Sequence, residues 1–171
     1  MKTIILFFGI GLLLLSFRTP AQPKNPAYQA VAAVLDSLNI RAARADYKAY
    51  FELYAEDAIF MGTDATERWT KSAFAKWSKK FFDRGKAWSF KVLQRHIYFS
   101  QDGQMAWFDE LLDTQMKVCR GSGVLRKEGK QWRIVQYTLS TTVPNTIVDQ
   151  VTELKRHEED SLIQVLRKKQ D

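Results

Sequence analysis

The sequence predicts an α+β fold in which helices come first and an antiparallel sheet follows. In the first half of the chain, apolar residues such as Val31, Val34, Leu35 and Leu38 recur at helical spacing. From residue 87 onward, polar and apolar residues instead alternate with period two through four segments joined by short turns. The helices are therefore expected to cover one face of the sheet.

Three helices are expected before the sheet. Asn25 and Pro26 form an N-cap and a first helical position, and the helix that they begin runs to about Ala45. Asp46 can cap a second, shorter helix that carries aromatic residues as far as residue 54, and Thr70 can cap a third that ends at residue 85. A brief strand at 58–62 and a polar loop at 63–69 are expected between the second and third helices. The inward side chains of the third helix are expected to be aromatic, namely Phe74, Trp77 and Phe81.

The expected strands of the sheet cover residues 87–99, 105–113, 117–127 and 131–142. Pro144 ends the last strand. A final helix is predicted from residue 146 to about residue 168, with apolar residues at both of its ends and a charged middle.

The first 21 residues have the pattern of a secretory signal peptide. Lys2 precedes an apolar run at 4–15, and a small residue, Ala21, stands at the expected cleavage site. The run is shorter than the roughly 20 apolar residues that a membrane span requires, so no stable span is expected after cleavage. Export to a periplasmic or secreted location, and a mature chain beginning at Gln22, are the expectations.

The mature chain would carry 24 basic and 19 acidic side chains, a net charge of +5. Since charges of both signs are mixed along the sequence, a nucleic-acid partner is not expected. Cys119 is the single cysteine, so an intrachain disulfide is excluded. Acidic residues beside His157 are consecutive on one helix and do not share a face, so neither a metal nor another cofactor is expected.

The turns of the sheet predict which strand residues lie opposite one another. Asp102-Gly103 is a two-residue hairpin signal that places Arg95 opposite Glu110. Three-residue turns at 114–116 and 127–129 would extend this row to Arg120 and Gln136. The row would share the covered face with apolar residues including Phe108.

Glu110 would then lie buried between two arginines, and two interpretations remain open. The four side chains could form an internal ion-pair network that only fixes the strand register. They could instead form the polar floor of a cavity, with one positive charge available for a ligand's anion or carbonyl group. A buried ion pair is often replaceable by apolar residues without loss of stability, which favours the cavity.

Four segments of the chain resemble the SnoaL-like branch of the nuclear transport factor 2-like superfamily: GTDATERW at 62–69, AWFDELL at 106–112, RGSGVL at 120–125 and WRIVQYTLSTTVPN at 132–145. The resemblance covers about residues 31–145. It implies a cone in which N-terminal helices pack on a curved antiparallel sheet. The domain would occupy residues 22–145, and the C-terminal helix at 146–171 would be an addition to it.

The resemblance also implies a cavity between the helices and the sheet, but it leaves the activity open. Isomerases, dehydratases, polyketide cyclases and noncatalytic binding domains share the fold. Many relatives carry a histidine where this chain has Gln136 or Thr138, and the two histidines of this chain, His96 and His157, are expected at the surface. A catalytic base would therefore have to be a carboxylate. Asp64 and Glu67 are the candidates, with Tyr54 polarising a carbonyl group and Trp69 forming part of an aromatic wall.

Three functions therefore remain as expectations. The preferred one is an exported domain that binds a small polar or anionic molecule through Arg95, Glu110, Arg120 and Gln136, beside Phe108 and Trp69. The second is an isomerase- or cyclase-type enzyme that uses Asp64 or Glu67 with Tyr54. The third is a homodimeric interaction module that uses the outer sheet face, where Trp107, Tyr98 and Tyr137 are expected.

Overall fold

The computed structural model describes residues 25–169 as helices packed on a six-stranded sheet. The predicted signal peptide lies outside the described residues. The α+β prediction is confirmed by the order of elements. The helices are α1 (Pro26–Ala43), α2 (Tyr47–Glu52), α3 (Lys71–Phe82), η1 (Asn145–Ile147) and α4 (Val148–Arg167). The strands are β1 (Tyr54–Met61), β2 (Arg68–Thr70), β3 (Lys91–Phe99), β4 (Met105–Thr114), β5 (Lys117–Glu128) and β6 (Gln131–Thr141).

The three predicted helix caps are confirmed. The side chains of Asn25, Asp46 and Thr70 accept hydrogen bonds from the backbone N–H groups of Ala27, Ala49 and Ala73. The buried side of α3 differs from the prediction, since it presents Phe74, Ser78 and Phe82 rather than Phe74, Trp77 and Phe81. The i, i+4 spacing of the buried residues follows one helical ridge, which leaves Trp77 at the edge of the covered face.

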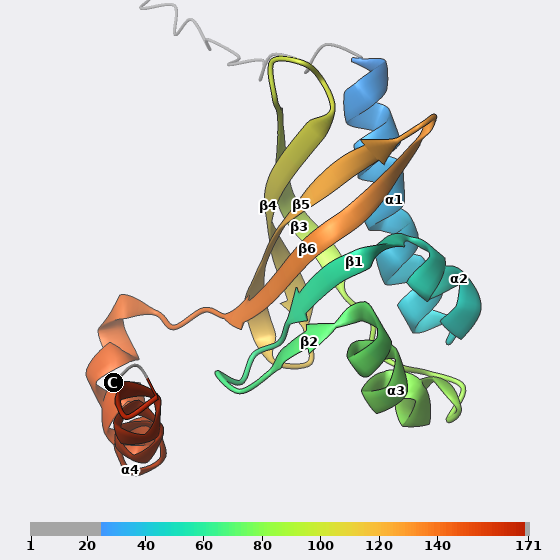
Figure 1. Cartoon of the computed structure of the whole chain (residues 1–171). Coiled ribbons are helices and arrows are strands. Elements are labelled where there is room, and N and C mark those ends of the chain that lie inside the picture. The colour runs from blue at the N-terminus through green and yellow to red at the C-terminus, as the bar shows by residue number, and fades with distance from the viewer. Residues whose placement is uncertain (1–24, 170–171) are drawn as a thin grey trace, which may run out of the picture.

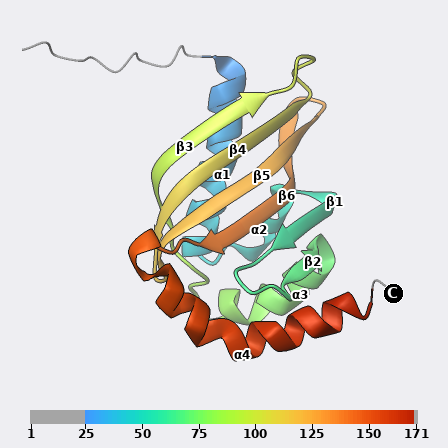
Figure 2. The same ribbon diagram turned by 90° about the vertical axis from the view of Figure 1, so that its left-hand side faces the viewer.

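The strand order in the sheet is β2-β1-β6-β5-β4-β3. Neighbouring strands are antiparallel except β1 and β6, which run parallel, and β2 is a short strand that the sequence did not predict. Helices α1, α2 and α3 lie on one side of this curved sheet (Figure 1). From the opposite side, the outer face of β3 to β6 is open to view and α4 extends past the lower end of the sheet (Figure 2).

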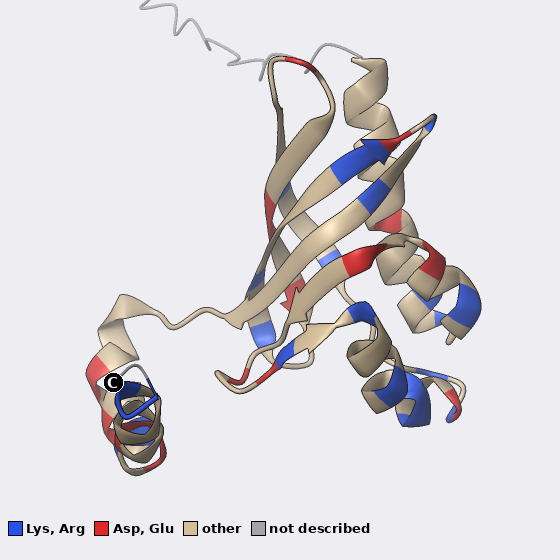
Figure 3. Ribbon diagram, viewed as in Figure 1, with Lys and Arg blue, Asp and Glu red and all other residues tan. Residues whose placement is uncertain are grey.

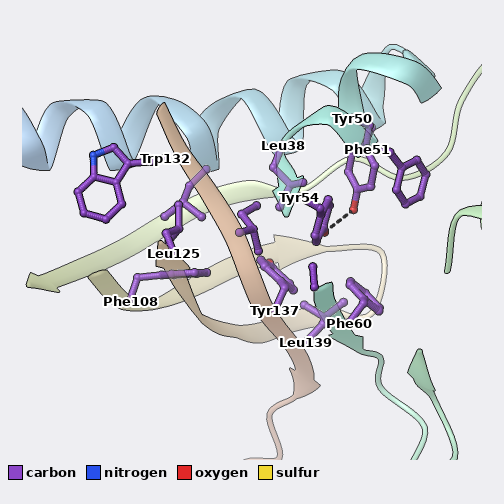
Figure 4. Close-up of a cluster of buried hydrophobic side chains, with 14 of the residues drawn as sticks. Leu38, Tyr50, Phe51, Tyr54, Phe60, Phe108, Leu125, Trp132, Tyr137 and Leu139 are labelled. Carbon is purple, nitrogen blue, oxygen red and sulfur yellow. Dashed lines mark hydrogen bonds between the residues drawn. The ribbon is translucent and has the colours of Figure 1, made fainter. Parts of the chain in front are cut away.

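The core lies between the inner face of the sheet and the first three helices. Leu35 and Leu38 of α1 meet Leu112, Leu125 and Ile134 of the sheet in one buried cluster. Aromatic rings from α2, β1 and β6 fill the wider end, and Figure 4 shows them converging beneath α1 and α2. By contrast, no residue of α4 is buried, so this helix does not contribute to the core.

The first predicted hairpin is confirmed, but the register of the next two is wrong. Arg95 lies opposite Glu110, as expected. The β4–β5 turn has two residues rather than three, and therefore Glu110 lies opposite Gly121 while Arg120 lies opposite Leu111. Thr114 stabilises this tighter turn, because its hydroxyl accepts from the N–H of Met116 and donates to the carbonyl of Lys117, both at 2.9 Å. A shift of one residue moves Arg120 to the other face of the sheet.

In the last hairpin the predicted turn at 127–129 is wrong, since Glu128 lies opposite Gln131 and the turn is Gly129-Lys130. A bulge in β6 changes the pairing of this strand further. Leu125 lies opposite Ile134, yet the neighbouring Val124 lies opposite Gln136, so β6 contains one extra residue at this point. The extra residue turns Gln136 outward and Tyr137 inward. The predicted positions of Gln136 on the covered face and of Tyr137 on the outer face are therefore both wrong.

Candidate functional site: an aromatic cavity beneath the helices

A cavity of about 160 Å³ lies between the three N-terminal helices and the inner face of the sheet. Loops 62–67 and 88–90 and the β4–β5 turn complete its wall. Most of the lining is aromatic or aliphatic. The lining residues are Leu38, Asn39, Tyr50, Phe60, Gly62, Thr63, Glu67, Trp69, Phe74, Trp77, Trp88, Phe90, Gln115, Met116, Tyr137 and Leu139.

Several of the aromatic rings in this wall are stacked nearly parallel. The rings of Phe60 and Phe74 lie 3.8 Å apart with an interplanar angle of 9°, and those of Phe60 and Tyr137 lie 5.8 Å apart at 2°. Trp69 stacks on Trp77 at 4.7 Å. Parallel rings present flat surfaces, which suit a planar ligand better than a globular one.

Charge is scarce in the wall of the cavity. Among the described residues, no lysine or arginine lines it, and Glu67 is the one carboxylate that does. An anion placed there would lose its hydration without gaining a countercharge. The cavity therefore favours uncharged ligands, or cations that can pair with Glu67.

Two buried tyrosines, Tyr50 and Tyr54, share a hydrogen bond of 3.1 Å at the helical end of the core, drawn as a dashed line in Figure 4. Tyr50 lines the cavity, and Tyr54 is buried. Burial raises the pKa of both phenols above the usual value of 10. Both hydroxyls therefore stay protonated at neutral pH. The predicted polariser, Tyr54, does not line the cavity.

A cluster around Glu110 lies next to the cavity, and its charged side chains, Asp36, Arg95 and Glu110, do not line the wall. Glu110 is 2% exposed, and its carboxylate accepts from Arg95 Nε at 2.7 Å and from the hydroxyl of Tyr137 at 3.3 Å. Arg95 Nη1 in turn donates to Asp36 at 2.7 Å and to the carbonyl of Ala32 at 3.4 Å. Arg95 Nη2 is buried and has no hydrogen-bond partner among the described residues.

Burial raises the pKa of Glu110 above its ordinary value of 4.5, and the positive charge of Arg95 limits that rise. Burial and the neighbouring Glu110 carboxylate also raise the pKa of Tyr137. Because Glu110 and Asp36 together balance Arg95, the positive charge expected for a ligand's anion is already compensated. Tyr137 is the single member of this cluster that reaches the cavity wall.

Gly121 provides the space for this arrangement. A Cβ atom at this position would lie 2.8 Å from the Tyr137 hydroxyl and 3.0 Å from Glu110. At Gly123, two residues on, a Cβ atom would lie 2.2 Å from the backbone carbonyl oxygen of Gln136 and 2.9 Å from the ring of Phe108, so this glycine accommodates the backbone of β6 at its bulge. Gly121 thus allows side chains from β4 and β6 to meet across β5, and Gly123 allows the β6 backbone to approach β5 closely.

The structure separates the residues predicted to bind ligand. Arg95 and Glu110 touch, but Arg120 and Gln136 are exposed on the outer face, for the register reasons given above. Phe108 is buried in the core and does not line the cavity, whereas Trp69 does.

The two predicted carboxylate bases occupy different positions on the loop before β2. Asp64 is exposed, and its side chain accepts hydrogen bonds from the N–H and hydroxyl of Thr66, which lower its pKa below the ordinary 3.8. A lowered pKa makes Asp64 a weaker base. Glu67 lies on the cavity wall against Gly62, where a Cβ atom would be 2.1 Å from its carboxylate.

Sequence reasoning missed five aromatic residues of the wall: Tyr50, Phe60, Trp88, Phe90 and Tyr137. Tyr137 was misplaced by the bulge, and the others lie in segments where no turn fixes the orientation of side chains. Within residues 25–169, no group of three His, Cys, Asp or Glu side chains converges as a metal ion would require. No helix of the same segment is long and apolar enough to cross a membrane.

The architecture is that of the nuclear transport factor 2-like fold. A nuclear transport factor 2-like protein of unknown function from Pseudomonas putida KT2440 superimposes with a TM-score of 0.59 at 16% identity, covering 70% of this chain and 89% of its own. A candidate dehydratase of the same family from Streptomyces avermitilis gives 0.58 at 10% identity, with 70% and 100% covered. A cystatin-like domain of unknown function from Nostoc punctiforme gives 0.62 at 13%, with 86% and 99% covered.

Residues 31–144 match the model of the SnoaL-like domain. The chain therefore belongs to the SnoaL-like domain family, in agreement with the resemblance noted in its sequence. No curated protein matches the sequence. The structural likenesses are all well below 25% identity and establish the fold alone.

Proposed function

We propose that this protein is a binding domain for a small, planar and uncharged aromatic molecule, held in the cavity described above. The observation that carries the proposal is the composition of the wall, with stacked aromatic rings and no lysine or arginine among the described residues. The volume of about 160 Å³ resembles that of an apolar cavity known to hold benzene in another protein, which suits a ligand with a single ring.

This ligand differs from the polar or anionic molecule expected from the sequence. That expectation required an arginine in the cavity whose charge is not neutralised by a carboxylate. Arg95 is instead paired with Glu110 and Asp36, and Arg120 lies on the outer face. Hydrogen-bonding groups do remain at the wall, in Asn39 and the phenol of Tyr50 for example. A hydroxyl or carbonyl substituent on the ring could bond to these groups.

Three probes that differ mainly in charge test the proposal: benzyl alcohol, benzylamine and benzoate, titrated by calorimetry. We expect the alcohol to bind, the amine to bind through Glu67, and benzoate to bind at least tenfold more weakly than the alcohol. Glu67→Gln should remove the contribution of the amine's charge and leave the affinity for the alcohol nearly unchanged. Tightest binding of benzoate would refute the proposal.

A second variant tests whether the probes enter this cavity. Leu139→Trp would place an indole in the cavity wall and should abolish binding of the alcohol. Tyr98→Phe, on the outer sheet face, is the matched control and should not change it. Unaltered affinity in Leu139→Trp would place the ligand elsewhere.

An enzyme of isomerase or cyclase type is the second candidate, and the observation that favours it is Glu67, a carboxylate on the wall of an aromatic cavity. Glu67 would remove a proton from a bound carbonyl compound, with the protonated phenol of Tyr50 donating a hydrogen bond to the carbonyl oxygen. Deuterium exchange into a single-ring ketone such as cyclohexanone, which the cavity volume admits, tests this function when followed by mass spectrometry. Exchange should disappear in Glu67→Gln and persist in Asp64→Asn.

We also infer export through cleavage after Ala21, since residues 1–21 have the pattern of a signal peptide. N-terminal sequencing of the protein purified from the periplasm or medium should begin at Gln22. Retention of Met1 in the cytoplasmic fraction would contradict export.

A homodimer through the outer sheet face is supported by Tyr98 and Trp107, which stack at 5.9 Å and are 47% and 46% exposed. Trp107→Lys should then convert a dimer to a monomer in sedimentation equilibrium. A wild-type protein that stays monomeric at high concentration would refute this arrangement.

A further inference from the structure

The excess positive charge of the protein is concentrated in one short segment. Residues 71–86, which comprise α3 and the turn after it, contain six basic side chains and one acidic side chain, a net charge of +5. Outside this segment and the predicted signal peptide, basic and acidic side chains are equal in number, 18 of each. Figure 3 shows the basic positions on α3 at the same end of the molecule as α2, whose one basic residue is Lys48.

Most of these cations are not neutralised. Lys71 pairs with Glu56 and Lys79 with Asp83. The other four are exposed and have no carboxylate within 4 Å among the described residues: Lys76, Lys80, Arg84 and Lys86.

Two aromatic side chains lie among these cations. Trp77 is 38% exposed and Phe81 is partly exposed, both because the buried side of α3 follows the ridge of Phe74 and Phe82. The ammonium of Lys80 lies 5.8 Å from the ring of Trp77 and 5.0 Å from that of Phe81. The guanidinium of Arg84 lies 5.1 Å from Phe81. The resulting surface combines amphipathic rings with unpaired positive charges.

We propose that this surface, formed by Lys76, Trp77, Lys80, Phe81, Arg84 and Lys86, binds the protein to membranes that contain anionic phospholipids. Lysine and arginine side chains are attracted to anionic headgroups, while indole and phenyl rings settle at the boundary between headgroups and acyl chains. A nucleic acid is a poorer fit, because the cations gather on one helix and its following turn rather than along an extended groove.

The position of Trp77 connects the surface with the cavity. This side chain belongs to the proposed lipid-binding surface and also lines the cavity, so the cavity wall reaches the membrane contact. An apolar ligand dissolved in the bilayer could thus enter without crossing water. The membrane proposal does not depend on the ligand, because it is based on the charge and aromatic side chains of the outer side of α3.

Sedimentation with vesicles tests the proposal in the mature protein, without any ligand. We expect binding to phosphatidylcholine vesicles that contain about one-third phosphatidylglycerol, little binding to pure phosphatidylcholine, and a decrease as the salt concentration rises. Each cation near such a surface strengthens binding about fivefold, so Lys76→Gln/Lys80→Gln/Arg84→Gln should weaken partitioning on the order of 100-fold.

The matched control removes three exposed cations elsewhere, with Arg120→Gln/Lys127→Gln/Lys130→Gln, and should change partitioning by less than about threefold. Equal weakening in the two triple variants would overturn the proposal, since net charge alone would then explain the binding. Equal binding to both kinds of vesicle would also overturn it. Binding to heparin or duplex DNA without binding to anionic vesicles would assign the surface to a polyanion instead of a membrane.

A quenching measurement checks the contact of the rings. Brominated acyl chains should quench part of the tryptophan fluorescence of the wild-type protein, and Trp77→Leu should reduce the quenched fraction. An unchanged fraction would show that Trp77 stays outside the bilayer and would refute the insertion of this ring.

Discussion

Replacing Glu110 with leucine should destabilise the protein strongly, and removing Arg95 as well should restore part of the loss. In the wild-type protein, the Glu110 carboxylate neutralises Arg95, whose side chain is 8% exposed, and accepts a hydrogen bond from Tyr137. Glu110→Leu leaves the guanidinium with Asp36 alone, a carboxylate that is 57% exposed and therefore screened by water.

The magnitude follows from these contacts. Breaking a buried ion pair by removing one partner costs about 3–5 kcal/mol of unfolding free energy, and the remaining Asp36 contact favours the lower end of that range. The Tyr137 hydroxyl also loses its acceptor, which adds about 1 kcal/mol. We therefore expect about 4 kcal/mol for Glu110→Leu. In Glu110→Leu/Arg95→Met the uncompensated buried charge is gone, so the loss should fall to about 2 kcal/mol.

Urea denaturation followed by circular dichroism gives these free energies, provided that the m-value is unchanged among the variants. The matched control is Glu110→Leu/Arg120→Met. Because Arg120 lies on the outer face, this second change should restore nothing. Equal rescue by the two arginine substitutions, or no rescue by Arg95→Met, would refute the assignment of Arg95 as the partner of Glu110.

Three further predictions concern the same region. Gly121→Ala should lower the free energy of unfolding in urea by about 1–3 kcal/mol, because the added Cβ displaces the Tyr137–Glu110 contact. The control Ser122→Ala, on the outward-facing side of β5, should change it by less than about 0.5 kcal/mol. Thr114→Ala should lower the free energy of unfolding by about 1–2 kcal/mol, because the β4–β5 turn loses two side-chain hydrogen bonds. An unchanged midpoint of urea denaturation would show that these hydrogen bonds contribute nothing. The pKa of Glu110 is higher in the folded than in the unfolded state, so its contribution to stability is fully present below the unfolded-state pKa and decreases as the pH rises through the folded-state pKa. The stability of the wild-type protein relative to Glu110→Gln should therefore fall above about pH 4.5. A rise would contradict the direction of the shift.

The order of elements and the helix caps could be predicted from local patterns. Capping by Asn25, Asp46 and Thr70 depends on residues within three positions, and the Asp102-Gly103 turn fixes the register of β3 and β4 by itself. The pairing of β1 with β6 could not be predicted in this way, because it joins segments more than 70 residues apart and no turn connects them. Its parallel direction depends on how the whole chain packs.

The site was predicted less well because it depends on register, which small local features control. The side chain of Thr114 selects a two-residue turn where the sequence also permits three, and β6 itself contains no glycine or proline that would indicate the bulge. Each feature shifts a strand by one residue and exchanges its faces. Arg120 and Gln136 consequently moved outward, while Tyr137 moved into the cavity wall.

The corrected register also changes what the buried carboxylate can do. Glu110 reaches the cavity through the hydroxyl of Tyr137, and burial raises the pKa of that phenol, so the hydroxyl stays protonated and its proton points toward Glu110. Tyr137 then contributes to the cavity wall, while its hydroxyl proton is already donated to Glu110. The Arg95–Glu110 pair thus orients one aromatic wall residue, which is a structural contribution to binding. Proton transfer, if the protein catalyses it, has to use Glu67 and Tyr50 on the other parts of the wall.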